Sequence, residues 1–229
     1  MERKIEIIMI YNHCPPKELP NLISETQSNG TRYYVTPNGV RLPSVTTVVG
    51  AKKKQSIMEW RNRVGEQEAN RVSKLATGRG NRVHNLAEKY LKNEKIDWQK
   101  EMPDSVAMFR SLVPHMQKIN NIHYIEQALW SETVGLAGRV DLIAEWDGVL
   151  SVIDFKTSKR VKSKEDIPDY FAQCTAYSAM YEEHIGVPIE QLVIVMAVED
   201  DKPLIFVEKT EDHLVNLVEH IEFYRKSIA

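Results

Sequence analysis

The sequence has little of what marks membrane, secreted or metal-cluster proteins. Its 229 residues include only two cysteines, Cys14 and Cys174, which are too few for a disulfide framework or a cysteine-rich zinc site. No apolar run approaches the ~18 residues of a transmembrane helix. The apolar stretch near the N-terminus is short, contains Glu6 and lacks a small-residue cleavage site. We therefore expect no signal peptide, no membrane partner and a reducing, cytoplasmic location.

The sequence also lacks a large net charge, but its charges are unevenly distributed. The formal net charge is −2, whereas residues 52–95 hold twelve Lys and Arg against five Glu, a local balance of +7. A basic segment on a nearly neutral chain is typical of a surface that follows a phosphate backbone. A solvated helix face gives the same pattern. Composition alone therefore leaves nucleic-acid binding open.

The apolar periodicity predicts an α/β domain with a mixed central β-sheet flanked by helices. Turn-forming pairs at Asn38-Gly39 and Asp147-Gly148 predict two hairpins, and Ser44 is expected to cap a short helix. We expect an N-terminal strand and arm over 1–30 and a single domain over 31–229, divided into a basic helical part (about 44–121) and a catalytic sheet with helices (about 122–229). The expected helices are 45–49, 55–76, 81–91, 104–120, 165–185 and 211–227, with Gly78 and Gly80 as a break, and the expected strands are 5–11, 33–35, 40–42, 123–132, 138–146, 149–156, 190–198 and 203–208, with a loop over 12–30.

Two of these strands carry charged residues in apolar surroundings. Asp141 lies on one strand, and Asp154 and Lys156 lie on the next, where alternation places them on one face. Burying such groups unpaired would cost several kcal/mol. A divalent cation between Asp141 and Asp154 would offset that cost, and hard carboxylate oxygens favour magnesium or manganese. A structural Asp–Lys pair on a surface hairpin is the alternative interpretation.

Four motifs in one order give this pattern a resemblance to a known family. The chain resembles the PD-(D/E)XK nucleases, in particular the RecB-like exonucleases and, within them, the mitochondrial genome maintenance exonucleases and related phage exonucleases. The resemblance covers residues 78–177, with weaker similarity from Pro43 onward. It rests on a glycine-then-histidine run (residues 77–84), on Asp141 thirteen residues before Asp154, on Ile153-Asp154-Phe155-Lys156-Thr157, and on Gln173 and Tyr177 in a Q-x-x-x-Y arrangement.

The resemblance implies a restriction-endonuclease-like core and a set of site residues. Asp141, Asp154, Lys156 and His84 would be catalytic, and the magnesium ligands would include His84, Asp141 and Asp154, with Mn²⁺ able to substitute. Glu126 is a candidate to complete the metal shell, directly or through water. Gln173 and Tyr177 would face the DNA strand, although helix packing is their alternative role. Arg61, Arg79 and Arg82 are candidates for phosphate contacts, although each could be an ordinary exposed arginine.

The family also implies partners and surroundings. Some relatives bind an iron–sulfur cluster through four cysteines, which this sequence lacks, so we expect none. The expected activity is an exonuclease on single-stranded or flapped DNA ends, in a bacterial or phage-infected cell or in an organelle matrix, with replication or recombination proteins as possible partners. A structure-specific endonuclease and a nuclease-dead DNA-binding module are the alternatives. No phosphate-binding G-x-x-x-x-G-K-[ST] motif is present, so any helicase coupling would need another chain.

Overall fold

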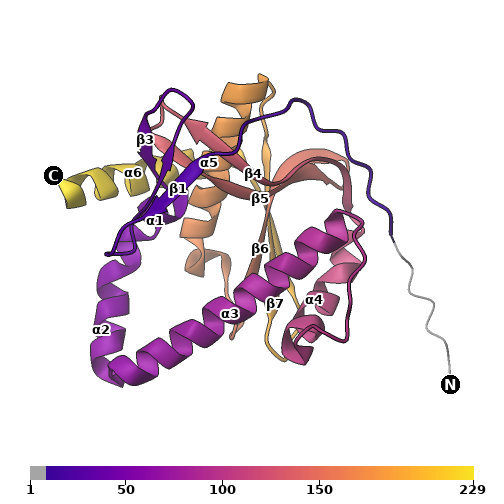
Figure 1. Cartoon of the computed structure of the whole chain (residues 1–229), viewed down its shortest axis with the longest axis horizontal. Helices are drawn as coiled ribbons and strands as arrows, with labels where there is room; N and C mark the ends of the chain where they lie inside the picture. The colour runs from indigo at the N-terminus through magenta and orange to yellow at the C-terminus, as the bar shows by residue number, and fades with distance from the viewer. Residues whose placement is uncertain (1–8) are drawn as a thin grey trace.

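The centre of the molecule is a five-stranded mixed sheet, seen in a computed structural model that describes residues 9–229 (Figure 1). Its strands lie in chain order: β4 (Ile119–Ser131), β5 (Leu136–Trp146), β6 (Val149–Ser158), β7 (Gln191–Val198) and β8 (Leu204–Lys209). β6 and β7 are parallel, and the other neighbours are antiparallel. This arrangement confirms the predicted α/β fold with a mixed central sheet.

Helices cover both faces of the sheet, because the middle strands send apolar side chains to both sides. Val152 of β6 joins a buried cluster with helices α1 (Val45–Val49), α5 (Pro168–Ile185) and α6 (Leu214–Ile228). Ile153 and Phe155 of the same strand join the opposite cluster, with α3 (Glu66–Leu91) and α4 (Pro103–Met116). The alternation inferred for this strand is thereby confirmed. Within residues 9–229, no helix combines the length and apolar character needed to cross a membrane.

A second, smaller sheet packs beside the first. It consists of β1 (Ile23–Thr26), β2 (Arg32–Val35) and β3 (Arg41–Pro43). The hairpin predicted at Asn38-Gly39 is present, with Gly39 at φ +80°. β1 falls where a loop was expected over 12–30, and all four of its residues are exposed. An edge strand held by main-chain pairing needs no alternating apolar pattern, so the sequence did not reveal it.

Two predicted elements differ from those that the described residues form, and one predicted turn is present. The strand predicted over 5–11 lies mostly outside the described residues, and residues 9–11 form no strand. The helix predicted over 104–120 ends at Met116, because Ile119 already pairs with Trp146 as the start of β4. The hairpin at Asp147-Gly148 is confirmed, with both residues at positive φ, 51° and 81°.

The helical segment over residues 54–91 breaks at a different glycine from the one expected. Helix α2 (Lys54–Val64) and α3 are separated by Gly65, at φ +85° and ψ 151°. The predicted break at Gly78 and Gly80 is wrong, because α3 runs through both without interruption for 26 residues. A helix tolerates glycine at about 1 kcal/mol each. The apolar contacts of Val83, Leu86 and Leu91 with the sheet hold this helix in place.

Candidate metal centre

The site lies where β5 and β6 run side by side. Leu142 pairs with Ile153, so Asp141 and Asp154 follow at the next position of each strand. The backbone N–H of Phe155 donates a hydrogen bond to Oδ2 of Asp141, with a length of 2.9 Å. The two acids, thirteen residues apart in sequence, are therefore neighbours because the tight turn at residues 147–148 folds one strand back on the other.

Asp154 and Lys156 form a buried ion pair. The Lys156 Nζ lies 2.6 Å from Oδ2 and 2.8 Å from Oδ1 of Asp154, whose side chain is 2% exposed. Burial raises the pKa of Asp154 to about 6 against the opposing charge of Lys156, and Asp141 adds to the rise. Burial also lowers the pKa of Lys156, but Asp154 and Asp141 together hold it above its usual range.

Three residues that the sequence assigned to a metal converge on one point. Ligand atoms of His84, Glu126 and Asp141 all lie within 4.8 Å of one another. The Nδ1 atom of His84 is 3.3 Å from Oδ2 of Asp141. Asp154, the fourth expected ligand, is outside this group, and its carboxylate accepts hydrogen bonds from Lys156 and Gln173. The donor set of two carboxylates and an imidazole suits a divalent cation such as magnesium or manganese.

Glu126 shows that this acid cluster fits a cation. Its backbone is left-handed, at φ +51°, a conformation that costs a non-glycine residue free energy and often occurs at functional sites. Burial raises the pKa of Glu126 to about 7, and the negative charges of Asp141 and Glu88 contribute further. A divalent ion held by these carboxylates would relieve that repulsion.

His84 reaches the site because α3 passes close to the end of β6. At Gly80, one turn before His84, an added Cβ would lie 3.5 Å from the Thr157 hydroxyl. The two residues therefore mark a close approach of helix and strand. Glu88, considered from sequence as a partner for the imidazole, instead forms a 2.6 Å ion pair with Lys92.

Gln173 and Tyr177 lie beneath the site rather than on its surface. The Nε2 atom of Gln173 donates a 2.9 Å hydrogen bond to Oδ1 of Asp154, and the residue is 7% exposed. Tyr177 is 2% exposed and packs so tightly on Gly138 that an added Cβ would lie 2.6 Å from its hydroxyl. The family resemblance placed both residues against the DNA strand, with helix packing as the alternative, and in the structure both lie packed where α5 covers this face of the sheet.

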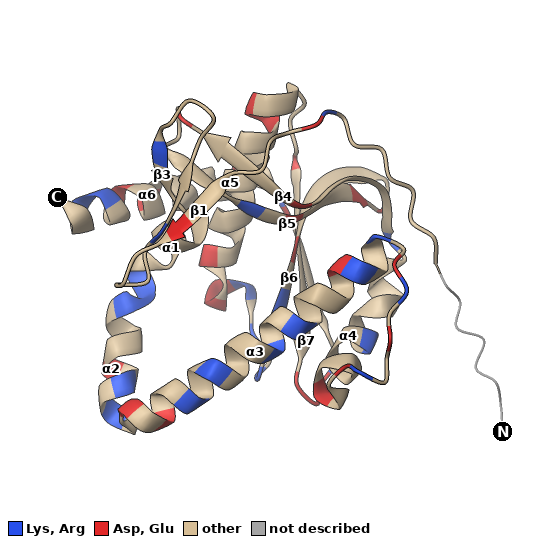
Figure 2. Cartoon of the chain, in the orientation of Figure 1, with Lys and Arg blue, Asp and Glu red and all other residues tan. Residues whose placement is uncertain are grey.

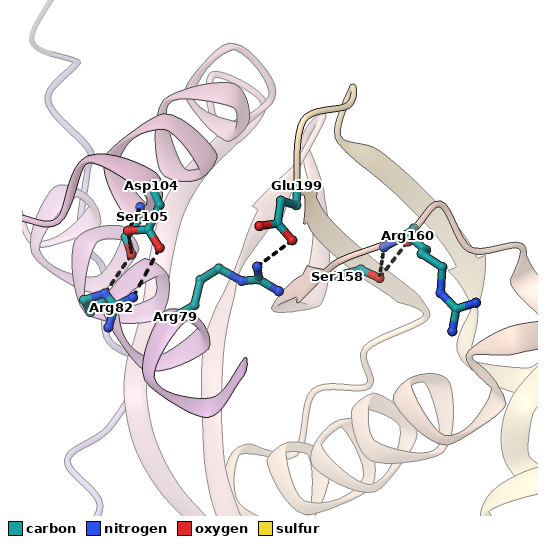
Figure 3. A network of polar contacts seen from close by, with 7 residues as sticks. All are labelled: Arg79, Arg82, Asp104, Ser105, Ser158, Arg160 and Glu199. Carbon is teal, nitrogen blue, oxygen red and sulfur yellow. Dashed lines mark hydrogen bonds and ion pairs between the residues drawn. The ribbon is translucent and has the colours of Figure 1, made fainter. Parts of the chain in front are cut away.

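The three candidate arginines also have protein partners, and Figure 3 shows those of Arg79 and Arg82. Arg79 forms a 2.8 Å ion pair with Glu199, and its side chain is only 14% exposed. Arg82 donates to the Ser105 hydroxyl at 2.8 Å and lies 3.4 Å from Asp104. Arg61, on α2, donates to the Asn70 side chain. Arg79 and Arg82 therefore help to join α3 to its neighbouring elements.

One aromatic residue near the site received no role from the sequence. The Lys156 Nζ lies 5.1 Å from the ring centroid of Tyr170, and Lys53 lies 5.5 Å from it. Tyr170 is three residues before Gln173 in α5, so the two share a helical face. The spacing could have suggested this placement, but the ring position depends on how α5 packs against β6.

Comparison with known proteins identifies the family of the chain. A family model described as the PD-(D/E)XK nuclease superfamily matches residues 58–224. Mitochondrial genome maintenance exonuclease 1 of Homo sapiens is 27% identical over 177 residues, which are 71% of this chain and 51% of the relative. The protein of the same name from Mus musculus is 26% identical over 174 residues, with the same two shares. The chain spans about half the length of the curated relatives it matches.

Solved structures show more distant likeness. A candidate exonuclease from Eubacterium rectale is 15% identical, with a TM-score of 0.44 over 67% of this chain and 65% of that one. The protein SSO0001 is also 15% identical, with a TM-score of 0.42 over 81% of this chain and 74% of that one.

Proposed function

The chain belongs to the PD-(D/E)XK nuclease superfamily, and from that premise we propose that it is a metal-dependent DNA exonuclease that favours single-stranded or flapped ends. The observation that carries the proposal is the grouping of His84, Glu126 and Asp141 beside the Asp154–Lys156 pair. Three possible metal ligands and the ammonium group of Lys156 thus lie together where β5 and β6 run side by side. Phosphodiester hydrolysis needs both.

The proposed mechanism assigns each residue a separate task. Asp141, Glu126 and His84 would hold the divalent ion, with Asp154 as the additional proposed ligand on the neighbouring strand. When bound, Mg²⁺ or Mn²⁺ would supply Lewis-acid activation of the phosphate and of water. Lys156, held by Asp154, would stabilise the negative charge that develops on the phosphate oxygens. Water adds to phosphorus, the bond to the departing sugar oxygen breaks, and that oxygen takes up a proton.

The preference for ends is supported by the arm formed by α2 and the first half of α3. No residue of α2 is buried, and in α3 only Ala69 is buried before Val83. Lys and Arg recur along both helices (Figure 2). A basic arm joined to the site through His84 would hold a single strand by its phosphates. The names of the curated relatives also include exonuclease activity.

The test compares circular and linear single-stranded DNA of one sequence, with magnesium present. An enzyme that must start at an end degrades the linear strand and leaves the circle intact. Equal degradation of both would favour the endonuclease alternative. Intact DNA in both reactions, with DNA still bound, would favour the nuclease-dead module.

The metal requirement is tested in parallel on the linear strand. Cleavage should stop in excess chelator and return with Mg²⁺ or Mn²⁺. Ca²⁺ should suppress it, because calcium accepts a looser coordination. Asp141→Asn should raise the metal concentration needed for half-maximal cleavage, since a neutral amide is a poorer ligand. Robust cleavage in chelator would refute the proposed mechanism.

A further inference from the structure

The catalytic strand continues directly into a strongly basic loop. From Lys156 to Lys164, nine residues hold five Lys and Arg and no Asp or Glu. β6 ends at Ser158, whose hydroxyl donates to the Arg160 carbonyl at 2.6 Å and accepts from the Arg160 N–H at 3.3 Å. These two bonds fix the turn of the loop. The Arg160 guanidinium extends away from the ribbon with no drawn partner (Figure 3).

The basic loop (residues 158–162) surrounds a hollow of about 480 Å³ together with Asp166. Among residues 9–229, none of Lys159, Arg160 and Lys162 has a carboxylate within 4.0 Å, in contrast to Lys164, which pairs with Glu208. Asp166 is engaged by Ser163, whose N–H and hydroxyl donate to its carboxylate at 2.8 and 3.2 Å. Bonds from Ser163, followed by the charges of Lys162 and Lys53, keep the pKa of Asp166 below its usual value. The hollow therefore carries an excess of positive charge.

Tyr170 links this hollow to the catalytic lysine. Its ring centroid lies 5.1 Å from the Nζ of Lys156 and 5.1 Å from the Nζ of Lys162. The Lys162 Nζ also donates to the Tyr170 hydroxyl at 3.1 Å. The two ammonium groups thus flank one aromatic ring. The hollow itself gathers three cations, Lys159, Arg160 and Lys162, with the one carboxylate of Asp166. These cations repel one another, and an anion among them would offset that repulsion.

We infer that the basic loop is a second phosphate-binding site, which holds a phosphate of the DNA strand next to the one cleaved at Lys156. This inference rests on the proposed function. Tyr170 would lie under the strand between the two phosphates, where its ring can stack with a base or sugar. The phosphate held by the loop is either an internal one or the terminal phosphate of the strand. In both cases Arg160 and Lys162 act by positioning the substrate.

The experiment measures DNA binding in chelator, so that no cleavage occurs and binding is separated from the proposed chemistry. Wild type, Arg160→Gln/Lys162→Gln and the control Lys226→Gln are compared on a single-stranded oligonucleotide. Lys226 is an exposed cation near the end of α6, with its side chain 81% exposed and its Nζ 4.0 Å from Glu222. The double variant should bind about tenfold more weakly, the loss of one charge-assisted contact. Its salt slope should fall by about 0.7, the value for one phosphate on a single strand. Lys226→Gln should match wild type.

Neutral phosphates then locate the contact. Each oligonucleotide of a series carries a single uncharged methylphosphonate, at a different position in each. One further oligonucleotide lacks the terminal phosphate. Wild type should lose affinity at one position, and the double variant should lose nothing further there. A response at an internal position identifies an internal phosphate, and a response only at the end identifies the terminal one. In magnesium, the double variant should raise KM and leave kcat near wild type.

Other results would overturn the inference. Equal affinity of wild type and the double variant, or an equal loss in Lys226→Gln, would show that the loop contributes nothing specific. A double variant that still responds to the same neutral phosphate would place the contact elsewhere. Absence of cleavage in the wild type, with the binding pattern as expected, would refute the proposed nuclease and leave the phosphate site standing.

Discussion

Lys156 has a structural and a proposed chemical role, and two substitutions separate them. Lys156→Ala should lower cleavage by about 100- to 1,000-fold, because in the proposed mechanism the lysine stabilises charge that develops only in the transition state. Single-turnover cleavage measures this rate, and fluorescence anisotropy should show DNA affinity close to wild type.

Removing one partner of a buried ion pair can also destabilise the fold, so a second variant is needed. Lys156→Arg keeps a cation beside Asp154 and should preserve the melting temperature, but its planar guanidinium places the charge differently. It should therefore also cleave poorly. Near wild-type cleavage by Lys156→Ala would show that the site is misassigned.

Gln173 offers a test of whether a residue contacts DNA or positions a ligand. Its side chain donates to Asp154, so Gln173→Ala should lower kcat by about 10- to 100-fold. DNA affinity should be unchanged, and the metal concentration for half-maximal cleavage should rise. Gln173→Glu should be at least as harmful, since it places a second carboxylate beside Asp154. A variant that loses DNA affinity with kcat intact would support the DNA-facing role that the family resemblance implies.

At the scale of elements, two glycines mark where a helix meets the sheet. Replacing each by alanine should change the stability of the fold in opposite directions. Gly80 lies within α3, where an added Cβ would have only an ordinary contact at 3.5 Å. Gly80→Ala should therefore stabilise the helix by up to about 1 kcal/mol and raise Tm by about 2–4 °C. A lower Tm would mean that α3 lies closer to β6 than described.

Gly138 lies in β5 against α5, where an added Cβ would meet the Tyr177 hydroxyl at 2.6 Å and its ring at 3.0 Å. Gly138→Ala should therefore cost about 1–3 kcal/mol. Adding Tyr177→Phe removes the closest atom and should recover part of that loss. The absence of any recovery, measured by urea unfolding, would contradict the described packing of α5 on β5.

At the scale of the whole molecule, buried histidines couple stability to pH. Burial lowers the pKa of His220, which is 4% exposed on α6. The unfolded chain then binds a proton more readily, so the contribution to stability is present above pH ~6.5 and is lost as pH falls toward the folded pKa. His220→Gln cannot titrate, so it should lose less stability than wild type on acidification.

Urea unfolding of both proteins at pH 7.5 and 5.5, in chelator, measures this difference. The comparison is needed because Glu126 acts in the opposite direction. Its pKa is raised by burial to about 7, so it stabilises the fold as pH falls through that value. Glu126 is common to both proteins, and its effect cancels. An equal loss of stability in wild type and His220→Gln would show that the histidine titrates normally in the folded state.

The sequence by itself determined the features that depend on local rules. Alternation along residues 149–158 placed Asp154 and Lys156 on one face, and Asp147-Gly148 specified the turn that brings Asp141 beside them. The order of elements also gave the mixed sheet. Strand alternation and turn geometry depend only on neighbours in the chain, so the printed residues are sufficient to predict them.

The tertiary structure alone decided the features that depend on packing between distant segments. The passage of α3 through two glycines, the burial of Gln173 and Tyr177 under the site, and the partners of Arg79 each require a helix to lie on one particular part of the sheet. The same holds for Tyr170, whose ring is 5.1 Å from both the Lys156 and the Lys162 Nζ only because α5 packs against β6. No local propensity specifies such contacts, because the free energy of burying apolar area depends on the partner surface and not on the sequence spacing.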